Sequence, residues 1–475
     1  MRRGSVFLAI VLAALTPALA GAADAPSAGR DERLFPRAAA LEPPIRFWKA
    51  VFTEYSTHQV VLHDALHLDK TYKVLDFRRH LDDGLSLGDV DEIRRVETDL
   101  ELARLRATLL RLHGLGPNPA GLTAEEQRVY DLFKDDAAPD RFLAAAGDKR
   151  LRSQRGLRER FGEAIRVSRR YLPEMERIFR AEGLPVELTR LPLIESCFDL
   201  QAYSKVGAAG IWQFMPATGR RFMRVDNLVD ERRDPLGSTR AAARYLAEMH
   251  DDLGGWPLAI TAYNHGPQGI SRAVDDVGSS DVATIISDYR GTAFGFASRN
   301  FYPEFLAALE IEADYEKYFG DLPVEPPLRA IERRLDRAVG IEQAARLAGT
   351  DRDEIAALNP ALSSAVVSGR RAIPAGYRLR LPEAAAQGFE TKLAALPEAP
   401  RIERVAARTG AKGSRPETRR VSYATHRVRR GQTLSGIAKK HGVSVASLRN
   451  ANRLGKSSLL RAWQTLRVPL SANEA

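Results

Sequence analysis

Apolar residues recur along this chain with two different spacings, which together predict many helices and a few short strands. Between residues 89 and 146 they lie three or four positions apart, as on the buried face of an α-helix. Residues 45–76 are rich in aromatic and β-branched side chains and predict short strands joined by turns. A basic helix is expected over 156–182, and a further helical region runs to about residue 318. The pattern predicts a mainly helical protein.

Two segments near the C-terminus carry a mixed pattern. Residues 425–470 alternate apolar and polar positions, then show two helical stretches, then alternate again, which predicts a small α+β module with the order βααβ. Residues 325–383 show a weaker version of the same order. Between them, residues 384–424 are rich in Pro, Ala and Arg and predict a basic flexible linker. A chain of 475 residues is also too long for one core, so several domains are expected.

The N-terminus predicts a targeting segment. Arg2 and Arg3 precede an apolar run from Val6 to Leu15, and small residues at 18–20 follow at cleavage spacing. This is typical of a secretory signal peptide, assigned to residues 1–23, and the run is too short to span a bilayer comfortably. We therefore expect export to the periplasm or cell envelope with no stable membrane span after cleavage; an uncleaved anchor is the alternative. Residues 24–150 form an accessory region without assigned chemistry.

Composition narrows the classes of partner. One cysteine excludes an internal disulfide framework and a Cys-rich metal site, and the nine histidines show no metal-ligand spacing, so no metal or cofactor is expected. No nucleic-acid motif is present. The net charge of +10 is located in the tail, because residues 396–475 hold 17 Lys and Arg against 4 Asp and Glu. The excess therefore indicates an anionic partner for the tail alone.

The candidate chemistry begins at Glu195. Leu188, Leu191 and Ile194 lie three residues apart and place an apolar wall beside this carboxyl group. A carboxyl held against apolar surface has a raised pKa and can stay protonated near neutral pH, as a general acid requires. The alternative is an ordinary surface glutamate at a helix end.

Neighbouring segments supply groups that suit a sugar. Gln213 offers an amide donor and acceptor for hydroxyl and acetamido groups, and the small residues around it allow close approach of a ligand. Trp212 could form an apolar platform, although core packing is the commoner use of a tryptophan. Tyr263 and Asn264 lie at the end of an apolar helix, where Tyr263 alone would more often be a core residue.

Three ordered motifs carry a family resemblance. Glu195-Ser196, the segment 208–216 (AAGIWQFMP) and the segment 262–264 (AYN) resemble the motifs of family-1 lytic transglycosylases. The resemblance implies a goose-type lysozyme-like catalytic domain, mainly α-helical, over residues 151–320. It also implies a peptidoglycan substrate, which these enzymes cut without water.

The same resemblance implies a mechanism with one carboxyl group. Glu195 would protonate the oxygen of the MurNAc-β-1,4-GlcNAc bond, and its carboxylate would then take the proton of the muramic C6 hydroxyl as that oxygen attacks C1. The product is a 1,6-anhydro-MurNAc end. The other residues that the family pattern places in the cleft are Ser204, Gln213, Met215 and Tyr263, with Asn264 as a brace.

One departure from the family bears on the reaction. Related soluble enzymes carry a second glutamate before a late helix, whereas residues 297–303 contain no carboxylate. Asp199 and Asp226 are alternative second carboxylates, or else turn residues. A second carboxylate would permit a muramidase-type hydrolase on the same fold. A non-catalytic peptidoglycan-binding protein is the third interpretation, and the retained Glu195 speaks against it.

The C-terminal module resembles a LysM domain over nearly all of 425–470. LysM domains bind N-acetylglucosamine-containing glycans, which implies peptidoglycan glycan strands as the partner. The implied groove residues are Gly431, Gln432, Thr433, Leu434 and Asn452. Residues 325–383 resemble a degenerate second copy, for which a packing role is at least as well founded as glycan binding. The flanking modules resemble those of a membrane-bound subgroup of the family.

Overall fold

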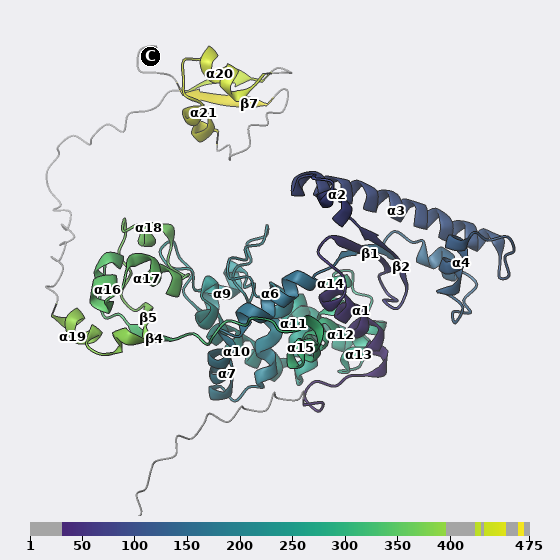
Figure 1. Cartoon of the computed structure of the whole chain (residues 1–475), viewed down its shortest axis with the longest axis horizontal. Helices are drawn as coiled ribbons and strands as arrows, with labels where there is room; N and C mark the ends of the chain where they lie inside the picture. The colour runs from purple at the N-terminus through teal and green to yellow at the C-terminus, as the bar shows by residue number, and fades with distance from the viewer. Residues whose placement is uncertain (1–30, 396–422, 429–431, 453–463, 470–475) are drawn as a thin grey trace, which may run out of the picture. The chain divides into compact units, whose positions relative to one another are not determined.

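The computed structural model describes residues 31–395, 423–428, 432–452 and 464–469. The chain divides into two units, Met1–Leu396 and Pro397–Ala475, and each is described by itself. Helices dominate the first unit and the sheets are small (Figure 1), so the predicted fold class is confirmed. The predicted signal peptide and most of the predicted linker lie outside the described residues. No helix among the described residues combines the length and the apolar character that crossing a membrane requires.

A large helical body surrounds the long helix α14 (Phe296–Ala313). Most of α14 is buried, and it packs against α1, α8 and α11 in one apolar core. The other elements of this body are α1 (Glu42–Thr53), α6 (Arg158–Ser168), α7 (Leu172–Ala181), η2 (Val186–Arg190), α8 (Leu191–Glu195), α9 (Pro216–Phe222), η3 (Glu231–Arg233), α10 (Pro235–Leu253), α11 (Trp256–His265), α12 (Pro267–Val277), α13 (Val282–Asp288) and α15 (Tyr315–Phe319).

The first helix corrects one prediction. Residues 45–53 were expected as strand and turn, but they belong to α1, which begins with prolines in its first turn. Ile45, Trp48 and Phe52 lie three and four positions apart and face the core. Trp48 Nε1 donates to Asn300 Oδ1 of α14 at 3.0 Å. The N-terminal segment thus forms part of the helical body that carries the predicted site.

The helix expected over 156–182 is two helices, which is a second correction. A turn at 169–171 separates α6 from α7. Pro173 lies in the first turn of α7, where a proline lacks the N–H that would continue a helix from before it. Ser168 Oγ donates to the Ile165 carbonyl at 2.8 Å near the end of α6. The break directs α7 toward α10, against which it packs.

A three-stranded antiparallel sheet belongs to the N-terminal part of this unit. Its strands are β1 (Gln59–Asp64), β2 (Thr71–Asp76) and β3 (Leu151–Arg155), in the order β2-β1-β3. It forms a separate apolar core with the helices α2 (Arg78–Asp82), α3 (Leu87–Leu115), α4 (Ala124–Asp131) and α5 (Arg141–Ala145). The long helix α3 extends along this subdomain (Figure 1).

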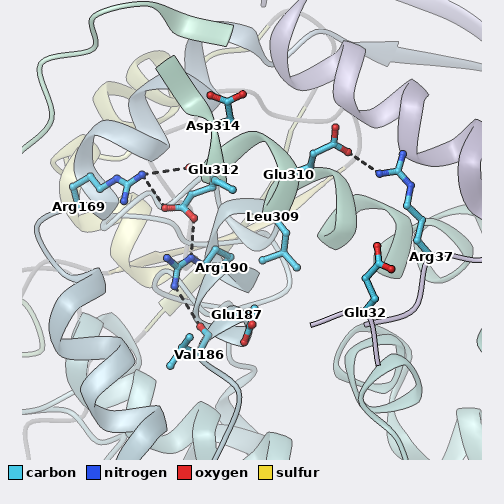
Figure 2. A pocket seen from close by; sticks show the side chains of 11 residues that line it. Glu32, Arg37, Arg169, Val186, Glu187, Arg190, Leu309, Glu310, Glu312 and Asp314 are labelled. Carbon is cyan, nitrogen blue, oxygen red and sulfur yellow. Dashed lines mark hydrogen bonds and ion pairs between the residues drawn. The ribbon is translucent and has the colours of Figure 1, made fainter. Parts of the chain in front are cut away.

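An ion-pair network links the C-terminal half of α14 to its neighbours and lines a cavity of about 480 Å³ (Figure 2). Glu312 lies 3.0 Å from guanidinium nitrogens of both Arg169 and Arg190. Glu310 lies 2.8 Å from Arg37 Nη1. Glu310 and Glu312 are each paired with arginine, and none of the predicted site residues lines the cavity. The network therefore holds helices together.

The predicted degenerate LysM-like segment forms a compact unit with its own core, in which a third short helix follows the two expected between the strands. Strands β4 (Ala330–Arg334) and β5 (Arg378–Pro382) pair antiparallel around α16 (Ile341–Ala348), α17 (Arg352–Leu358) and α18 (Ser364–Val367). The unit continues past residue 383, through η4 (Glu383–Ala386) and α19 (Phe389–Ala394). Phe389 and Leu393 are buried in its core. Residues 384–394 are thus helical and packed, unlike the linker expected there.

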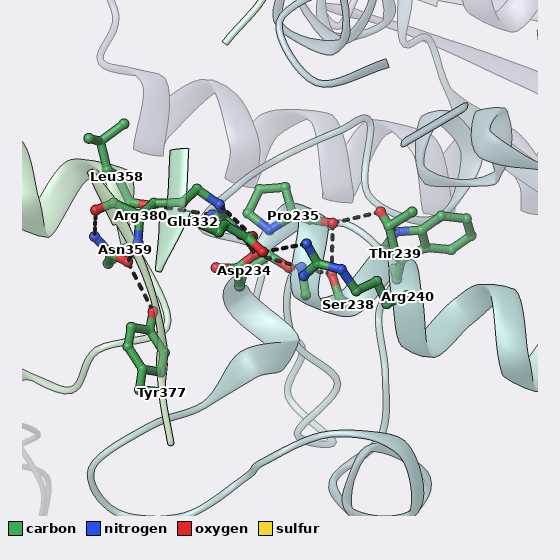
Figure 3. Close-up of polar contacts among 12 residues, drawn as sticks. Asp234, Pro235, Ser238, Thr239, Arg240, Glu332, Leu358, Asn359, Tyr377 and Arg380 are labelled. Atoms are coloured by element: carbon green, nitrogen blue, oxygen red, sulfur yellow. Dashed lines mark hydrogen bonds and ion pairs between the residues drawn. The ribbon is translucent and has the colours of Figure 1, made fainter. Parts of the chain in front are cut away.

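This unit is joined to the helical body by a charged cluster, which we call the Arg380 joint (Figure 3). Arg380 Nη2 lies 2.5 Å from Asp234 Oδ1 and 3.2 Å from Glu332 Oε1. Glu332 also pairs with Arg240 of α10 at 2.6 Å. Val229, from the segment before α10, lies in the apolar core of the LysM-like unit. Both charge pairing and burial therefore fix this unit to the body.

The second unit contains a small βααβ module, as predicted. Strand β6 (Tyr423–Arg427) pairs antiparallel with β7 (Thr465–Pro469), and the helices α20 (Leu434–Lys440) and α21 (Val445–Ala451) lie between them in sequence. Thr433 caps α20 by accepting from the Gly436 amide at 3.2 Å. Apolar residues of both helices and of β7 form the core.

Candidate active site

Glu195 is the last residue of α8, where the chain turns sharply. Cys197 and Phe198 both have positive φ, at 49° and 51°, which is uncommon for residues other than glycine. Ser196 Oγ donates to the Ile211 carbonyl at 3.0 Å. The turn is thus tied to the second motif, so that Glu195 and the loop at 208–216 are held in one place.

The Glu195 carboxyl is half-buried at the end of α8. Burial raises its pKa to about 8. Within the described parts of the chain it takes part in no hydrogen bond or ion pair. Below that pH the carboxyl is mostly protonated, so it can donate a proton to a bound substrate.

The segment 204–216 folds into a tight loop held by its own side chains. Ser204 Oγ accepts from the Ala208 amide at 2.9 Å, and Gln213 Nε2 donates to the Gly210 carbonyl at 2.8 Å. Gly210 has φ of +73°, and a Cβ there would meet the Arg232 carbonyl oxygen at 1.8 Å. A glycine is required at this position because the loop and the segment before α10 touch through their backbones. Met215 is exposed, with 42% of its surface accessible.

Trp212 forms part of the core, and the structure gives it no role as a sugar platform. Its ring is fully buried and stacks on Phe179, and its Nε1 donates to Thr239 Oγ1 at 2.9 Å. Tyr263 Oη donates to the Trp212 carbonyl at 2.8 Å. Burial raises the pKa of Tyr263 well above its usual range, and the charge of Glu195 raises it further. The second and third motifs therefore meet beside Glu195.

Asn264 lies at the exposed end of α11 and is linked to α14. Its Oδ1 accepts from Ser298 Oγ at 3.2 Å, and His265 Nδ1 lies 3.0 Å from the same hydroxyl. These hydrogen bonds link the end of α11 to α14, and the bracing role of Asn264 stays a prediction. His265, the last residue of α11, has a lowered pKa because of burial and the charge of Arg272.

The two aspartates considered as second carboxylates lie in turns. Asp199 Oδ1 accepts from the Gln201 amide at 2.8 Å. Asp226 Oδ1 accepts from the amides of Leu228 and Val229 at 2.8 and 2.9 Å. Glu304, which follows directly after the segment inspected for a second glutamate, is the carboxyl that the sequence reasoning missed. It lies on α14, which packs against α8, and the charge of Glu195 adds to burial in raising the pKa of Glu304.

Cys197 is a partly buried packing residue. Burial raises the pKa of its thiol, and the side chain packs against the main apolar core. It also lines a cavity of about 460 Å³ with Thr57 and Arg160. A reactive thiol would need a lowered pKa.

The predicted LysM groove residues differ in their surroundings. Gly431 lies outside the described residues. Gln432 Oε1 lies 3.0 Å from His426 Nε2, and Thr433 is exposed. Leu434 is buried in the core of the module. Asn452 Nδ2 donates to the carbonyls of Leu448 and Arg467 at 2.8 and 2.7 Å, so its amide supports the fold.

An equivalent asparagine occurs in the LysM-like unit. Asn359 Nδ2 donates to the carbonyls of Ile355 and Arg380, both at 2.8 Å, and its Oδ1 accepts from the Arg380 amide at 2.8 Å. Asn452 makes the same set, since its Oδ1 accepts from the Arg467 amide at 2.6 Å. In both units the asparagine bonds to the carbonyl four residues before it and to the last strand. Each of the two modules therefore contains an internal brace of the same kind.

Comparisons with known proteins agree with these parts. Residues 176–286 match the transglycosylase SLT domain, residues 333–398 match the LysM-like domain of lytic transglycosylase MltD, and residues 426–469 match the LysM domain. Membrane-bound lytic murein transglycosylase D of Escherichia coli (strain K12) is 29% identical over 296 residues, which cover 61% of each chain. This chain thus spans about three fifths of the length of that relative.

Two solved structures align less closely. An inactive mutant of lytic transglycosylase Slt from Pseudomonas aeruginosa aligns at 22% identity and a TM-score of 0.27, over 43% of this chain and 30% of that one. The 70 kDa soluble lytic transglycosylase of Escherichia coli aligns at 16% identity and a TM-score of 0.26, over 62% and 54%. By its matched segments, the chain contains a transglycosylase SLT domain, followed by an MltD-type LysM-like domain and a LysM domain.

Proposed function

We propose that this protein is a lytic transglycosylase that cleaves the MurNAc-β-1,4-GlcNAc bond of peptidoglycan and leaves 1,6-anhydro-MurNAc ends. The observation that carries the proposal is the Glu195 carboxyl, half-buried, with its pKa raised to about 8 and with two further motif segments beside it. A general acid for a glycosidic oxygen requires these properties.

In the proposed reaction one carboxyl group acts twice. Glu195 donates its proton to the leaving glycosidic oxygen, and the neighbouring 2-acetamido group of the sugar stabilises the positive charge at C1. The Glu195 carboxylate then accepts the proton of the muramic C6 hydroxyl as its oxygen bonds to C1. This proton transfer returns Glu195 to its starting state, and no water is consumed.

The loop and Tyr263 supply the surrounding shape. In this proposal Gln213 and the exposed Met215 contact the substrate, and Ser204 supports the loop through its bond to the Ala208 amide. Tyr263 bonds to the Trp212 carbonyl and so holds the loop close to Glu195. Asn264 acts at a distance, by tying α11 to α14 through Ser298.

Digestion of purified sacculi tests the reaction directly. Mass spectrometry of the products should find glycan ends that are one water lighter than hydrolysed ends, and Glu195→Gln should abolish them. Glu182→Gln, at the exposed end of α7, is the matched control and should retain activity. Free reducing muramic ends would identify a muramidase-type hydrolase instead, and cleavage by Glu195→Gln would refute the assignment of the acid.

The tail has the complementary role in this proposal. The LysM domain would hold the enzyme on glycan strands in the cell envelope, aided by the basic excess of residues 396–475. Because this electrostatic part is screened by salt, sacculus binding should weaken as ionic strength rises. Deleting residues 425–470 should reduce sedimentation with sacculi. Unchanged sedimentation of that variant would contradict the anchoring role.

A further inference from the structure

Glu304 is a carboxyl group in apolar surroundings on the central helix. Its neighbours in sequence, Tyr302, Pro303 and Phe305, are all buried, and Glu304 itself is half-buried. Helix α14 packs against α8, which ends at Glu195, and against α11, which carries Tyr263. The helix that carries Glu304 thus packs against the elements that carry the first and third motifs.

The other two acids of α14 differ from Glu304 in having partners. Glu310 pairs with Arg37 and Lys49, and Glu312 pairs with Arg169 and Arg190. In the parts of the chain that the structure describes, Glu304 takes part in no hydrogen bond or ion pair, and the same holds for Glu195. Within the described residues, neither carboxyl group is thus paired with a basic group.

Two such groups do not both ionise near neutral pH, because each charge is costly in an apolar site and the charges repel. Burial and the charge of Glu195 raise the pKa of Glu304 well above its usual range. The Glu304 charge also raises the pKa of Cys197, in the turn after α8. The two groups that interact with Glu304 are Glu195, the last residue of α8, and Cys197, in the turn that follows it.

Among the described residues, the charged groups on the surrounding elements do not counter the rise in the pKa of Glu304. From α11, Tyr263 adds a phenol whose own pKa is raised. From α6, Arg160 acts on Cys197, which also feels the negative charge of Asp199. The basic groups of α1 and η2 that reach α14, such as Lys49, bind the two acids farther along the helix.

We propose that Glu304 is a positioning residue that acts through Glu195: it keeps its proton, so that Glu195 alone exchanges a proton with the substrate. The inference rests on the proposed function for the identity of the substrate. Inverting hydrolysis needs a second carboxylate that takes a proton from water, and retaining hydrolysis needs one that attacks C1. An uncharged Glu304 can do neither. This leaves the internal C6 hydroxyl as the group that Glu195 activates.

Infrared difference spectroscopy tests the protonation state without any reaction. At about pH 7 the full-length protein should carry a protonated-carboxyl band that Glu304→Gln lacks and a second one that Glu195→Gln lacks. A Glu304→Gln spectrum identical to that of the wild type in this region would overturn the proposal, since Glu304 would then be ionised. This result is independent of whether the enzyme forms anhydro products.

Kinetics test the link to Glu195. The glutamine of Glu304→Gln resembles the protonated acid, so this variant should keep the wild-type dependence of kcat/KM on pH. Glu304→Lys places a positive charge beside Glu195 and should move the basic limb of that profile toward acid by about 1–3 pH units. Glu316→Lys, exposed on α15, makes the same change of net charge and should leave the profile in place.

Two kinetic outcomes would overturn the proposal. Loss of activity in Glu304→Gln as complete as in Glu195→Gln would mean that Glu304 works as a carboxylate. A Glu304→Lys profile identical to that of Glu316→Lys would mean that the two groups are not coupled. If Glu304→Lys does not fold, as judged by circular dichroism, Glu304→Gln and the infrared measurement still decide. Hydrolytic products from the wild type would contradict the proposed function. The infrared measurement would still decide whether Glu304 is protonated, because it does not depend on the reaction.

Discussion

We predict that removing one charge from the Arg380 joint lowers the free energy of unfolding of the first unit strongly. Arg380 and Asp234 are only 3% and 4% exposed, and Arg380 also contacts Glu332. In Arg380→Met the apolar side chain fills similar space, but Asp234 is left as a buried charge without its main partner. Breaking a buried ion pair from one side costs about 3–5 kcal/mol. Replacement of the exposed Arg378 on the same strand should cost within about 0.5 kcal/mol.

Urea unfolding followed by circular dichroism measures this difference. With an m value of about 3 kcal/mol per M, a loss of about 4 kcal/mol lowers the midpoint of the affected transition by about 1.3 M. Arg378→Met is the matched control, since it removes the same charge two residues earlier on β5. Equal midpoints for the two variants would refute the assignment of Arg380 as a buried docking group.

A double-mutant cycle separates the ion pair from general damage. Asp234 also caps α10 by accepting from the Gly237 amide at 2.7 Å, and asparagine caps helices equally well. Asp234→Asn therefore removes the charge but keeps the cap. Combining it with Arg380→Met should recover about 2 kcal/mol relative to the sum of the single changes. Simple additivity of the two changes would show that the pair is not coupled.

Three further predictions concern the site and the tail. Because Glu195 must be protonated to act as an acid and burial raises its pKa to about 8, kcat/KM on solubilised peptidoglycan should be full below that pH and fall about tenfold per unit above it; a flat profile to about pH 10 would contradict this. Gly210→Ala should destabilise the first unit by more than about 3 kcal/mol in thermal unfolding, because its Cβ would clash with the Arg232 carbonyl. The control Gly254→Ala, at a glycine with φ of +78° and open space around it, should cost about 1–2 kcal/mol. Asn452→Ala leaves a backbone amide and two carbonyls of the LysM domain without their partner, each worth about 1 kcal/mol, and should remove its cooperative melting transition; an unchanged transition would show that the amide is dispensable.

The elements that the sequence predicted well are those determined by local signals. The LysM domain combines a strand, the Thr433 cap and two helical stretches within about fifty residues, and the structure has this order. The helix α1 was missed because its aromatic residues favour strands by propensity. Its burial against α14 determines the outcome, and that contact joins residues 252 positions apart.

Within the candidate site, motif order located Glu195, Gln213 and Tyr263 but gave no partners. The bond from Tyr263 to the Trp212 carbonyl depends on how α11 meets the loop, which no local spacing encodes. Glu304 escaped notice because the sequence shows a charged residue after a proline, whereas the fold places it in apolar surroundings near a second carboxyl. The Arg380 joint was equally hidden, since Asp234 lies 146 positions away.

The Arg380 joint also determines where the protein can be divided. A fragment that ends near residue 320, where the catalytic domain was expected to end, would uncover Val229 and deprive Asp234 of its arginine. Such a fragment is expected to be poorly soluble in recombinant expression. A truncation after α19 keeps both contacts and the buried Phe389 and Leu393. A stable form of the helical body therefore includes the LysM-like unit, which in practical terms is a part of that body.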